Sequence, residues 1–198
     1  WQASLQLPGS ASANSLLARL LDLDYVQAAR VIENDDGAAA VVEGILMSAS
    51  STAVVIFPST LTTAQKEEVA ETIYENLAAG IATNGTDVVT TVTDAGGLTK
   101  TIRYSWASEV TVTVAFVVTL ETGYVLSDVS GPLQEAVDSY FDDLDVGDDV
   151  TLLAMYGLAA DVTGIRSVSS LLLNGGAADI TIDASEYATL NGTPSVTT

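Results

Sequence analysis

Residues 62–86, TTAQKEEVAETIYENLAAGIATNGT, decide how the first half of this chain folds. Thr62 and Gln65 have the spacing of a capping box, in which a hydroxyl and an amide satisfy the free N–H groups at a helix start. Apolar residues then recur every four positions, which predicts a helix over 62–80 with one buried face. The residues of that face are Val69, Ile73 and Leu77.

The end of this stretch predicts two bends. Gly80 is suited to the first position beyond a helix, where a left-handed backbone is common and glycine adopts it without steric cost. The chain then runs back and turns at Asn84-Gly85, a frequent turn dipeptide. We expect Gly80, Asn84 and Gly85 to be structural residues with no chemical role.

The residues before this helix predict one helix and two strands. A leucine stripe indicates a short helix over 14–24, with Asn14 or Ser15 as its N-cap. Alternating and β-branched residues predict strands over 25–35 and 52–58, with partly extended apolar sequence between them. Pro58 ends the second strand because proline cannot donate a hydrogen bond to a neighbouring strand.

The residues after the bends predict a hairpin and a long strand. Strands over 87–93 and 98–105 flank the turn sequence DAGG at 94–97. Valine and threonine then alternate from Val110 to Leu120, which predicts a strand with one apolar face. Tyr104 lies in the second strand of the hairpin and Trp106 directly follows it, and the sequence leaves open whether they form an exposed contact patch or pack in the core or at a strand edge.

A second amphipathic helix is predicted over 130–144. Ser130 is its expected N-cap and Pro132 lies in its expected first turn, where the missing N–H costs little. The apolar stripe that this helix buries consists of Leu133, Val137, Tyr140, Phe141 and Leu144.

The chain then turns and enters a further helix. Gly147 is the expected turn residue, and Asp148 or Asp149 is the expected N-cap of a helix within 145–161. Gly164 marks another turn, and two strands are expected within the final stretches at 163–176 and 178–190.

These elements predict an α+β fold in two small subdomains. The expected order is ββαββ and then βααββ, preceded by a short helix. The predicted boundaries are residues 1–24 for an N-terminal arm and helix, 25–107 for the first subdomain and 108–198 for the second.

The composition excludes several classes of function. The formal net charge is −20, from 26 acidic and 6 basic residues, which disfavours binding to nucleic acid or to an anionic membrane surface. The chain has no His and no Cys, which removes imidazole bases, thiol nucleophiles and the usual zinc ligands. We therefore expect no catalytic residue, no cofactor and no enzymatic activity.

A run of aspartates is the one candidate for a cation site. Its members are Asp142, Asp143, Asp145, Asp148 and Asp149. Calcium prefers several oxygen ligands, but the spacing is not that of an EF-hand loop. We expect a solvated turn and a helix N-cap here, without a metal ion. Glutamate pairs such as Glu67 and Glu71 follow from helical spacing, so they do not indicate a glycosidase.

Several stretches, in this order, resemble the baseplate J-like proteins of contractile phage tails and related injection machines. The resemblance spans about residues 16–190, and the ordered set is what carries it, since no single stretch is specific. The stretches are ARLLDLDYVQAARVIEN (18–34), EVAETIYENLAAGIATNGT (68–86), VTDAGGLTKTIRYSWASEVTVTVAF (92–116) and LDVGDDVTLLAMYGLAADVTGIRSV (144–168).

The resemblance implies a structural role. Such proteins form wedges that ring the central hub and spike of a baseplate, so the expected partners are other wedge and hub proteins and further copies in a ring. The expected location is the tail baseplate of a virion. The chain begins at Trp1 and lacks the family's N-terminal part, so we expect it to be a piece of a longer protein. The alternative is a secreted or cell-surface adhesion module of a saline organism, which acidity and threonine-rich strands suit equally.

Overall fold

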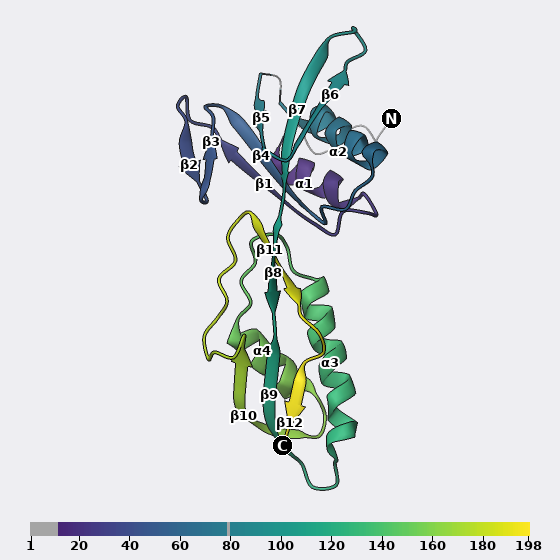
Figure 1. Cartoon of the computed structure of the whole chain (residues 1–198), viewed down its shortest axis with the longest axis vertical. Coiled ribbons are helices and arrows are strands. Elements are labelled where there is room, and N and C mark those ends of the chain that lie inside the picture. The colour runs from purple at the N-terminus through teal and green to yellow at the C-terminus, as the bar shows by residue number, and fades with distance from the viewer. Residues whose placement is uncertain (1–11, 79) are drawn as a thin grey trace, which may run out of the picture. The chain divides into compact units, whose positions relative to one another are not determined.

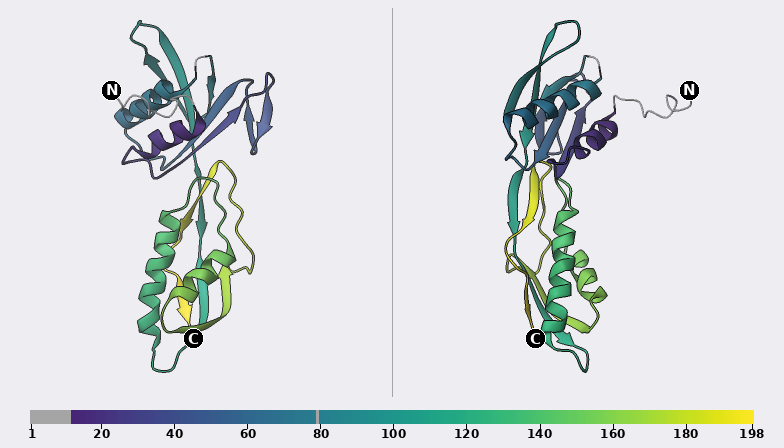
Figure 2. Two further views of the ribbon diagram at one scale, coloured as in Figure 1. Left: turned by 180° about the vertical axis from the view of Figure 1, so that it is seen from behind. Right: turned by 90° about the vertical axis from the view of Figure 1, so that its right-hand side faces the viewer.

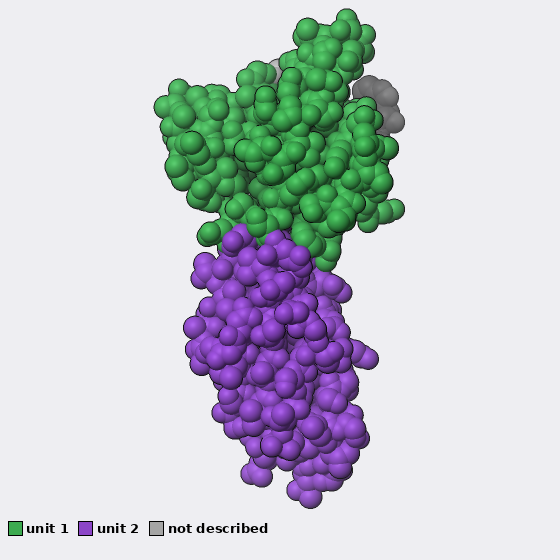
Figure 3. Space-filling view, viewed as in Figure 1, with its two compact units in different colours: residues 1–108, 183–185 green, residues 109–182, 186–198 purple. Residues whose placement is uncertain are grey.

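A computed structural model describes residues 12–78 and 80–198. Residues 1–11, most of the N-terminal arm that the sequence predicts, lie outside this described part. Residue contacts divide the chain into two compact units, which Figure 3 shows in separate colours. Unit 1 comprises residues 1–108 and 183–185, and unit 2 comprises residues 109–182 and 186–198.

Unit 1 is built on one mixed sheet (Figure 1). Its central strand β4 has the β-branched sequence STAVVIF and is buried along almost its whole length. β1 pairs antiparallel with all of β4, while β5 and β7 pair in parallel with successive parts of its other edge. β6 is the antiparallel partner of β7. These strands are β1 (Ala28–Asn34), β4 (Ser51–Phe57), β5 (Ala82–Asn84), β6 (Val88–Thr93) and β7 (Thr99–Trp106).

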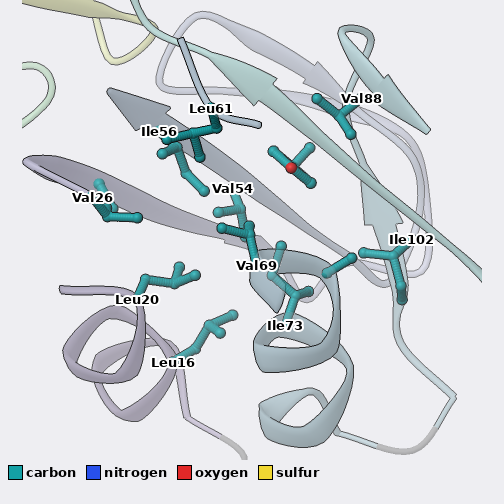
Figure 4. Packing of buried hydrophobic residues seen from close by; sticks show 13 residues of the cluster. Leu16, Leu20, Val26, Val54, Ile56, Leu61, Val69, Ile73, Val88 and Ile102 are labelled. Atoms are coloured by element: carbon teal, nitrogen blue, oxygen red, sulfur yellow. The ribbon is translucent and has the colours of Figure 1, made fainter. Parts of the chain in front are cut away.

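Two helices cover one face of this sheet, as Figure 4 shows from close by. α1 (Ala13–Leu21) packs against β1, and α2 (Thr63–Asn76) packs against β6, β7 and α1. Full burial of one such aliphatic side chain contributes about 1.5–3 kcal/mol before entropy. The core on this face consists of Leu16, Leu20, Val26, Ala29, Val54, Ile56, Leu61, Val69, Ala70, Ile73, Val88, Ile102 and Tyr104.

The hairpin of β2 (Ala40–Val42) and β3 (Ile45–Met47) packs beside the sheet in a second, smaller cluster. Ile32 of β1 and Ala53 of β4 are cross-strand partners and lie in this cluster with Met47. Ala184 completes it, although it lies far along the sequence from the rest of unit 1. Residues 183–185 are therefore an integral part of unit 1.

Unit 2 contains two small sheets and two helices (Figures 1 and 2). β9 lies between β10, its antiparallel partner, and β12, its parallel partner, while β8 pairs with β11. α3 contacts β11 and β12, and α4 packs on β10. The elements are β8 (Ser108–Val112), β9 (Val114–Leu120), α3 (Leu126–Asp142), α4 (Leu152–Asp161), β10 (Ile165–Leu173), β11 (Glu186–Leu190) and β12 (Ser195–Thr197).

The α+β class predicted from the sequence is confirmed. The alternation over 110–120 predicts a single strand, but the structure interrupts it at Thr113 and forms β8 and β9. The strand β12 and the β2–β3 hairpin also lie outside the predicted order. Among the described residues, no helix combines the length and the apolar character needed to cross a membrane.

Two predicted helix starts are wrong. α1 is capped by Ser12, whose hydroxyl accepts from the backbone N–H of Ser15, so neither Asn14 nor Ser15 is the N-cap. α3 begins at Leu126, well before Ser130. The carboxylate of Asp128 accepts from the N–H of Val125 at 2.9 Å and stabilises this earlier start.

Pro132 consequently lies inside α3. It cannot donate to the carbonyl of Asp128, so the helix forgoes one hydrogen bond there. The side chains that α3 buries are Val129, Leu133, Val137 and Phe141, which extend the predicted stripe by one turn toward the N-terminus. Packing of this stripe compensates for the missing bond.

Candidate functional site

The residues singled out from the sequence are turns and caps, and the structure places them in both units. Thr62, Gly80, Asn84 and Gly85 lie in unit 1, and Gly147, Asp148 and Gly164 lie in unit 2. These residues lie in separate turns and caps and do not form a catalytic cluster. Each one stabilises the backbone near it, as the next paragraphs describe.

Thr62 is the N-cap of α2. Its hydroxyl accepts from the backbone N–H of Gln65 at 3.3 Å, and the Gln65 amide oxygen accepts from the N–H of Thr62 at 2.8 Å. Both bonds of a capping box are therefore present, and they fix where the helix begins.

Gly80 is not the residue that ends α2. The helix ends at Asn76, and Leu77 already has an extended backbone with ψ of 139°. The expectation of a helix up to Gly80 is wrong because the alanine-rich sequence favours helix locally, while the chain must turn to reach β5. Gly80 does have φ of +89°, so the left-handed conformation that favours glycine is present, but in the connection and not at the cap.

Asn84 and Gly85 hold the end of β5 against two other strands. The Asn84 amide donates to the carbonyl of Leu46 in β3 at 3.1 Å. A Cβ atom on Gly85 would lie only 2.4 Å from the Cα of Tyr104 in β7. Glycine is required here because another backbone passes directly against it.

Tyr104 belongs to the core of unit 1, and the partly buried Trp106 packs against that core. Tyr104 is fully buried, and its hydroxyl donates to the carbonyl of Lys66 at 3.2 Å. Its ring meets that of Trp106 edge-on, with 5.4 Å between centroids. Burial raises the pKa of the Tyr104 phenol above its ordinary value. Of the two alternatives that the sequence leaves open, core packing is the one the structure shows.

Asn34, the last residue of the VIEN stretch, is a buried polar residue that the sequence did not single out. Its amide donates to the carbonyls of Ala38 and Ser48 at 3.0 and 2.7 Å, and its oxygen accepts from the N–H of Asp36 at 3.2 Å. The sequence feature that could have indicated this role is a single asparagine between a predicted strand and an Asp-Asp-Gly turn. Through these hydrogen bonds, Asn34 joins the loops that contain Ala38 and Ser48 to the end of β1.

The aspartate run folds into a turn that its own side chains stabilise. The carboxylate of Asp148 accepts from the N–H of Asp145 at 3.0 Å. Gly147 has φ of +85°, and its N–H donates to the carbonyl of Glu186 at 2.9 Å. In the described part of the chain, no three His, Cys, Asp or Glu side chains are arranged to hold a metal ion.

The expected N-cap of α4 is wrong. Thr151, and neither Asp148 nor Asp149, caps the helix through its hydroxyl, which accepts from the N–H of Ala154 at 3.3 Å. Asp149 instead accepts from the N–H of Ile182 at 2.7 Å. Its carboxylate therefore binds a distant segment of unit 2, which local spacing rules do not reveal.

Two structural features require glycine at position 164, a left-handed backbone and a close approach by a side chain. Its φ is +100°, and a Cβ atom there would lie 2.4 Å from the ring of Tyr124. The Gly164 carbonyl also accepts from the N–H of Glu121 at 2.9 Å. This turn therefore joins the start of β10 to the end of β9.

Asn174 fills the interruption between β8 and β9. Its side-chain oxygen accepts from the N–H of Thr113 at 2.8 Å and from the Thr113 hydroxyl at 3.1 Å. Its amide donates to the carbonyl of Thr111 at 3.3 Å. Asn174 also has φ of +50°, a conformation that asparagine tolerates better than most residues. Its partners lie far away along the chain, so no local spacing rule in the sequence points to Asn174.

The solvent-facing side of α4 is apolar. Leu153 is 82% exposed and Tyr156 is 40% exposed, and Gly157 and Ala160 are also exposed. These positions have the i, i+3, i+4, i+7 spacing of one helix face. Exposing this apolar face to water does not stabilise an isolated chain. A helix that is apolar on all sides is typically buried, and an exposed apolar patch often marks a contact with another protein.

The C-terminal part of the chain matches a known family model. Residues 110–195 match the model described as the baseplate J-like protein C-terminal domain.

Residues 110–195 are similar to the baseplate J-like protein C-terminal domain.

The resemblance to the baseplate J-like family inferred from the sequence is thereby confirmed. This domain covers nearly all of unit 2, including Asn174, Gly164 and the exposed face of α4. A chain of the cryo-EM structure of the anti-feeding prophage baseplate, 6-fold symmetrised, is similar in fold, with a TM-score of 0.54 and 14% sequence identity. The match covers 92% of this chain and 38% of that chain, so it extends into unit 1. No curated protein matches the sequence.

Replacing Asn174 is expected to destabilise unit 2. Asn174→Ala removes the hydrogen bonds to Thr111 and Thr113 and places alanine at positive φ, for a loss of about 1–3 kcal/mol. Asn174→Gly removes the same hydrogen bonds, but glycine adopts the positive φ without steric cost. The stability of this variant should therefore lie between that of Asn174→Ala and that of wild type. Urea denaturation followed by far-UV circular dichroism gives this order. Equal midpoints for wild type and Asn174→Gly would contradict the role of the side chain.

Proposed function

We propose that the chain is a structural component of the baseplate of a tailed virus or of a related contractile injection machine. The observation that carries this proposal is the match of residues 110–195 to the baseplate J-like domain. The fold similarity to a chain of the anti-feeding prophage baseplate supports it over a longer part of the sequence. The role is non-enzymatic, and the location is the tail baseplate.

The specific proposal is a wedge position around the central hub. There the chain contacts other wedge proteins, hub proteins and further copies of itself in a ring. The apolar face of α4, with Leu153 the most exposed of its residues, suits burial against a neighbouring baseplate subunit.

A substitution at Leu153 tests this surface in assembled particles. The tagged Leu153→Glu variant should fold normally, because the side chain is 82% exposed, but should be lost from particles purified from the source organism. Leu98→Glu is the matched control, since Leu98 is also a highly exposed leucine but lies in unit 1. Gold labelling of the wild-type tag should mark the distal end of the tail. Label on the capsid, or on a cell envelope without any tail, would refute the proposal.

Self-association of the isolated chain is expected to increase with salt. Each copy carries a formal net charge of −20, so two copies repel at low ionic strength. Raising salt shortens the screening length from about 30 Å at 0.01 M to about 10 Å at 0.1 M, which leaves apolar contacts less opposed. Sedimentation velocity at the two salt concentrations measures the change. A dimer that dissociates as salt rises would show that ion pairs, not apolar contacts, hold the copies together.

A further inference from the structure

The first part of β7, from Thr99 to Arg103, has a strand neighbour along one edge. β6 pairs with this part, with Thr93 opposite Thr99 and Val89 opposite Arg103. β4 reaches β7 only beyond it, at Ser105 and Trp106. No strand in the described part of the chain pairs with the other edge of this stretch.

The backbone N–H of Arg103 shows which groups face the open edge. It donates to the hydroxyl of Thr83 in β5 at 2.8 Å, and therefore points away from β6. Successive N–H groups of a strand point to alternate edges, so those of Thr101 and Thr99 point the same way as that of Arg103. An open edge of this kind is a template for another strand.

This edge forms one wall of a groove. The connection between α2 and β5, over residues 80–83, forms the facing wall, and Tyr74, Glu75 and Leu77 at the end of α2 also line the space. The groove has a volume of about 620 Å³. The bond between Thr83 and Arg103 marks where the two walls meet, and β5 and β7 diverge from there in Figure 1. The bend at Gly80 thus shapes the groove.

The groove concentrates positive charge in an acidic protein. Lys100 and Arg103 both line it, with side chains on opposite faces of β7, out of only 6 basic residues in the chain. Glu75 is the acidic residue among its described lining residues. Opposite charges on facing strands attract, so this site favours a strand that carries carboxylates.

We propose that this groove, the β7 edge groove, binds an extended acidic segment of a partner protein, which adds to β7 as a β-strand. Backbone bonds to Thr99 and Thr101 would supply affinity, and carboxylates beside Lys100 and Arg103 would supply selectivity. The segment comes from a different protein, because a second copy of this chain would bring a net charge of −20 with it. The groove belongs to unit 1 and lies outside residues 110–195, so its failure to bind would leave the baseplate proposal standing.

The test uses the full chain and a defined probe. The probe is a fluorescein-labelled peptide, TVEVTEVTV, whose two glutamates point to opposite faces of a strand as Lys100 and Arg103 do, and its control has lysine in place of both glutamates. Fluorescence anisotropy should show saturable binding of the acidic peptide and binding of the lysine peptide weaker by about tenfold or more. Equal affinity for both peptides, or no binding of either, overturns the proposal.

Two proline variants locate the binding edge. Thr101→Pro removes an N–H that faces the groove while leaving the pairing with β6 in place, so it should weaken peptide binding by about tenfold. Thr91→Pro is the matched control, because Thr91 is the cross-strand partner of Thr101 and its N–H faces the outer edge of β6. It should leave affinity unchanged. If Thr91→Pro weakens binding and Thr101→Pro does not, the peptide binds elsewhere and the proposal fails.

Two further measurements apply even where proline perturbs folding. The double variant Lys100→Glu, Arg103→Glu keeps the backbone and should reverse the preference between the acidic and lysine peptides. In the wild-type chain, the acidic peptide should slow hydrogen exchange at the Thr101 amide. An unchanged preference, or unchanged exchange at saturating peptide, overturns the proposal. Self-association of the chain that Thr101→Pro abolishes would identify a second copy as the occupant and overturn the assignment to a different protein.

Discussion

Replacing Gly85 with alanine is expected to unfold unit 1 under conditions in which unit 2 stays folded. The new Cβ atom would lie 2.4 Å from the Cα of Tyr104 and 2.5 Å from its carbonyl carbon and its nitrogen. All three are backbone atoms, so no side-chain rotation relieves the overlap. β5 or β7 must move, and Tyr104 is fully buried in the core that β7 supports. We expect a loss above about 3 kcal/mol, at the upper end of the cost of overpacking.

Tryptophan fluorescence measures this effect selectively. Trp106 lies in unit 1, and unit 2 has no tryptophan in its sequence. Gly37→Ala is the control, because a Cβ there would have no heavy atom within 4 Å and Gly37 lies in the same unit. Similar urea midpoints for Gly85→Ala and Gly37→Ala would show that the close approach of the two strands is not present in solution.

Ala184→Asp is expected to destabilise unit 1 almost as strongly. Ala184 is 9% exposed and packs with Ile32, Met47 and Ala53, all apolar. A carboxylate in this cluster has no opposite charge to pair with there, and such a buried charge costs about 3 kcal/mol or more. The substitution lies in the C-terminal part of the sequence, yet its effect should appear in the unit that holds Trp106.

The control for this prediction is Ala39→Asp, which makes the same change at an exposed position of unit 1. Trp106 fluorescence in urea should show a lower midpoint for Ala184→Asp and an unchanged one for Ala39→Asp. If Ala184→Asp leaves the fluorescence transition unchanged, residues 183–185 do not contribute to the core of unit 1.

Elements that depend on neighbouring residues were predictable from the sequence. The capping box of α2 needs only Thr62 and Gln65, and both of its hydrogen bonds are present. The hairpin of β6 and β7 was readable from alternation and from the turn at 94–97, where the Asp94 carboxylate accepts from the N–H groups of Gly96 and Leu98 at 2.8 Å. Periods of 2 and 3.6 residues are local properties, and they carry most of this information.

The predicted helix boundaries were wrong where tertiary packing outweighed local capping signals. Ser130 and Pro132 together are typical of a helix start, but burial of Val129 extends α3 upstream past both. The aspartates before α4 are good N-caps by residue type, yet Asp149 binds Ile182 and leaves the cap to Thr151. A single sequence does not show which distant partner competes for a side chain.

In the candidate site, too, features set by neighbouring residues were predictable and features set by distant residues were not. The sequence pointed to Asn84-Gly85 as a turn, but the reason for glycine is the backbone of β7, which no spacing rule reports. Nothing in the sequence marked Asn174, because its partners Thr111 and Thr113 lie much earlier in the chain. The open edge of β7 also depends on where β4 stops pairing, which is a property of the three-dimensional arrangement alone.

The position of residues 183–185 constrains how the protein is made. A ribosome delivers residues 1–108 first, but the cluster around Ile32, Met47 and Ala53 gains Ala184 only after residues 109–182 have also been synthesised. Until then, the nascent chain exposes an apolar surface beside the β2–β3 hairpin. Unit 1 is discontinuous in sequence and therefore cannot finish folding until residues 183–185 have left the ribosome, and only then should a protease-resistant unit 1 accumulate.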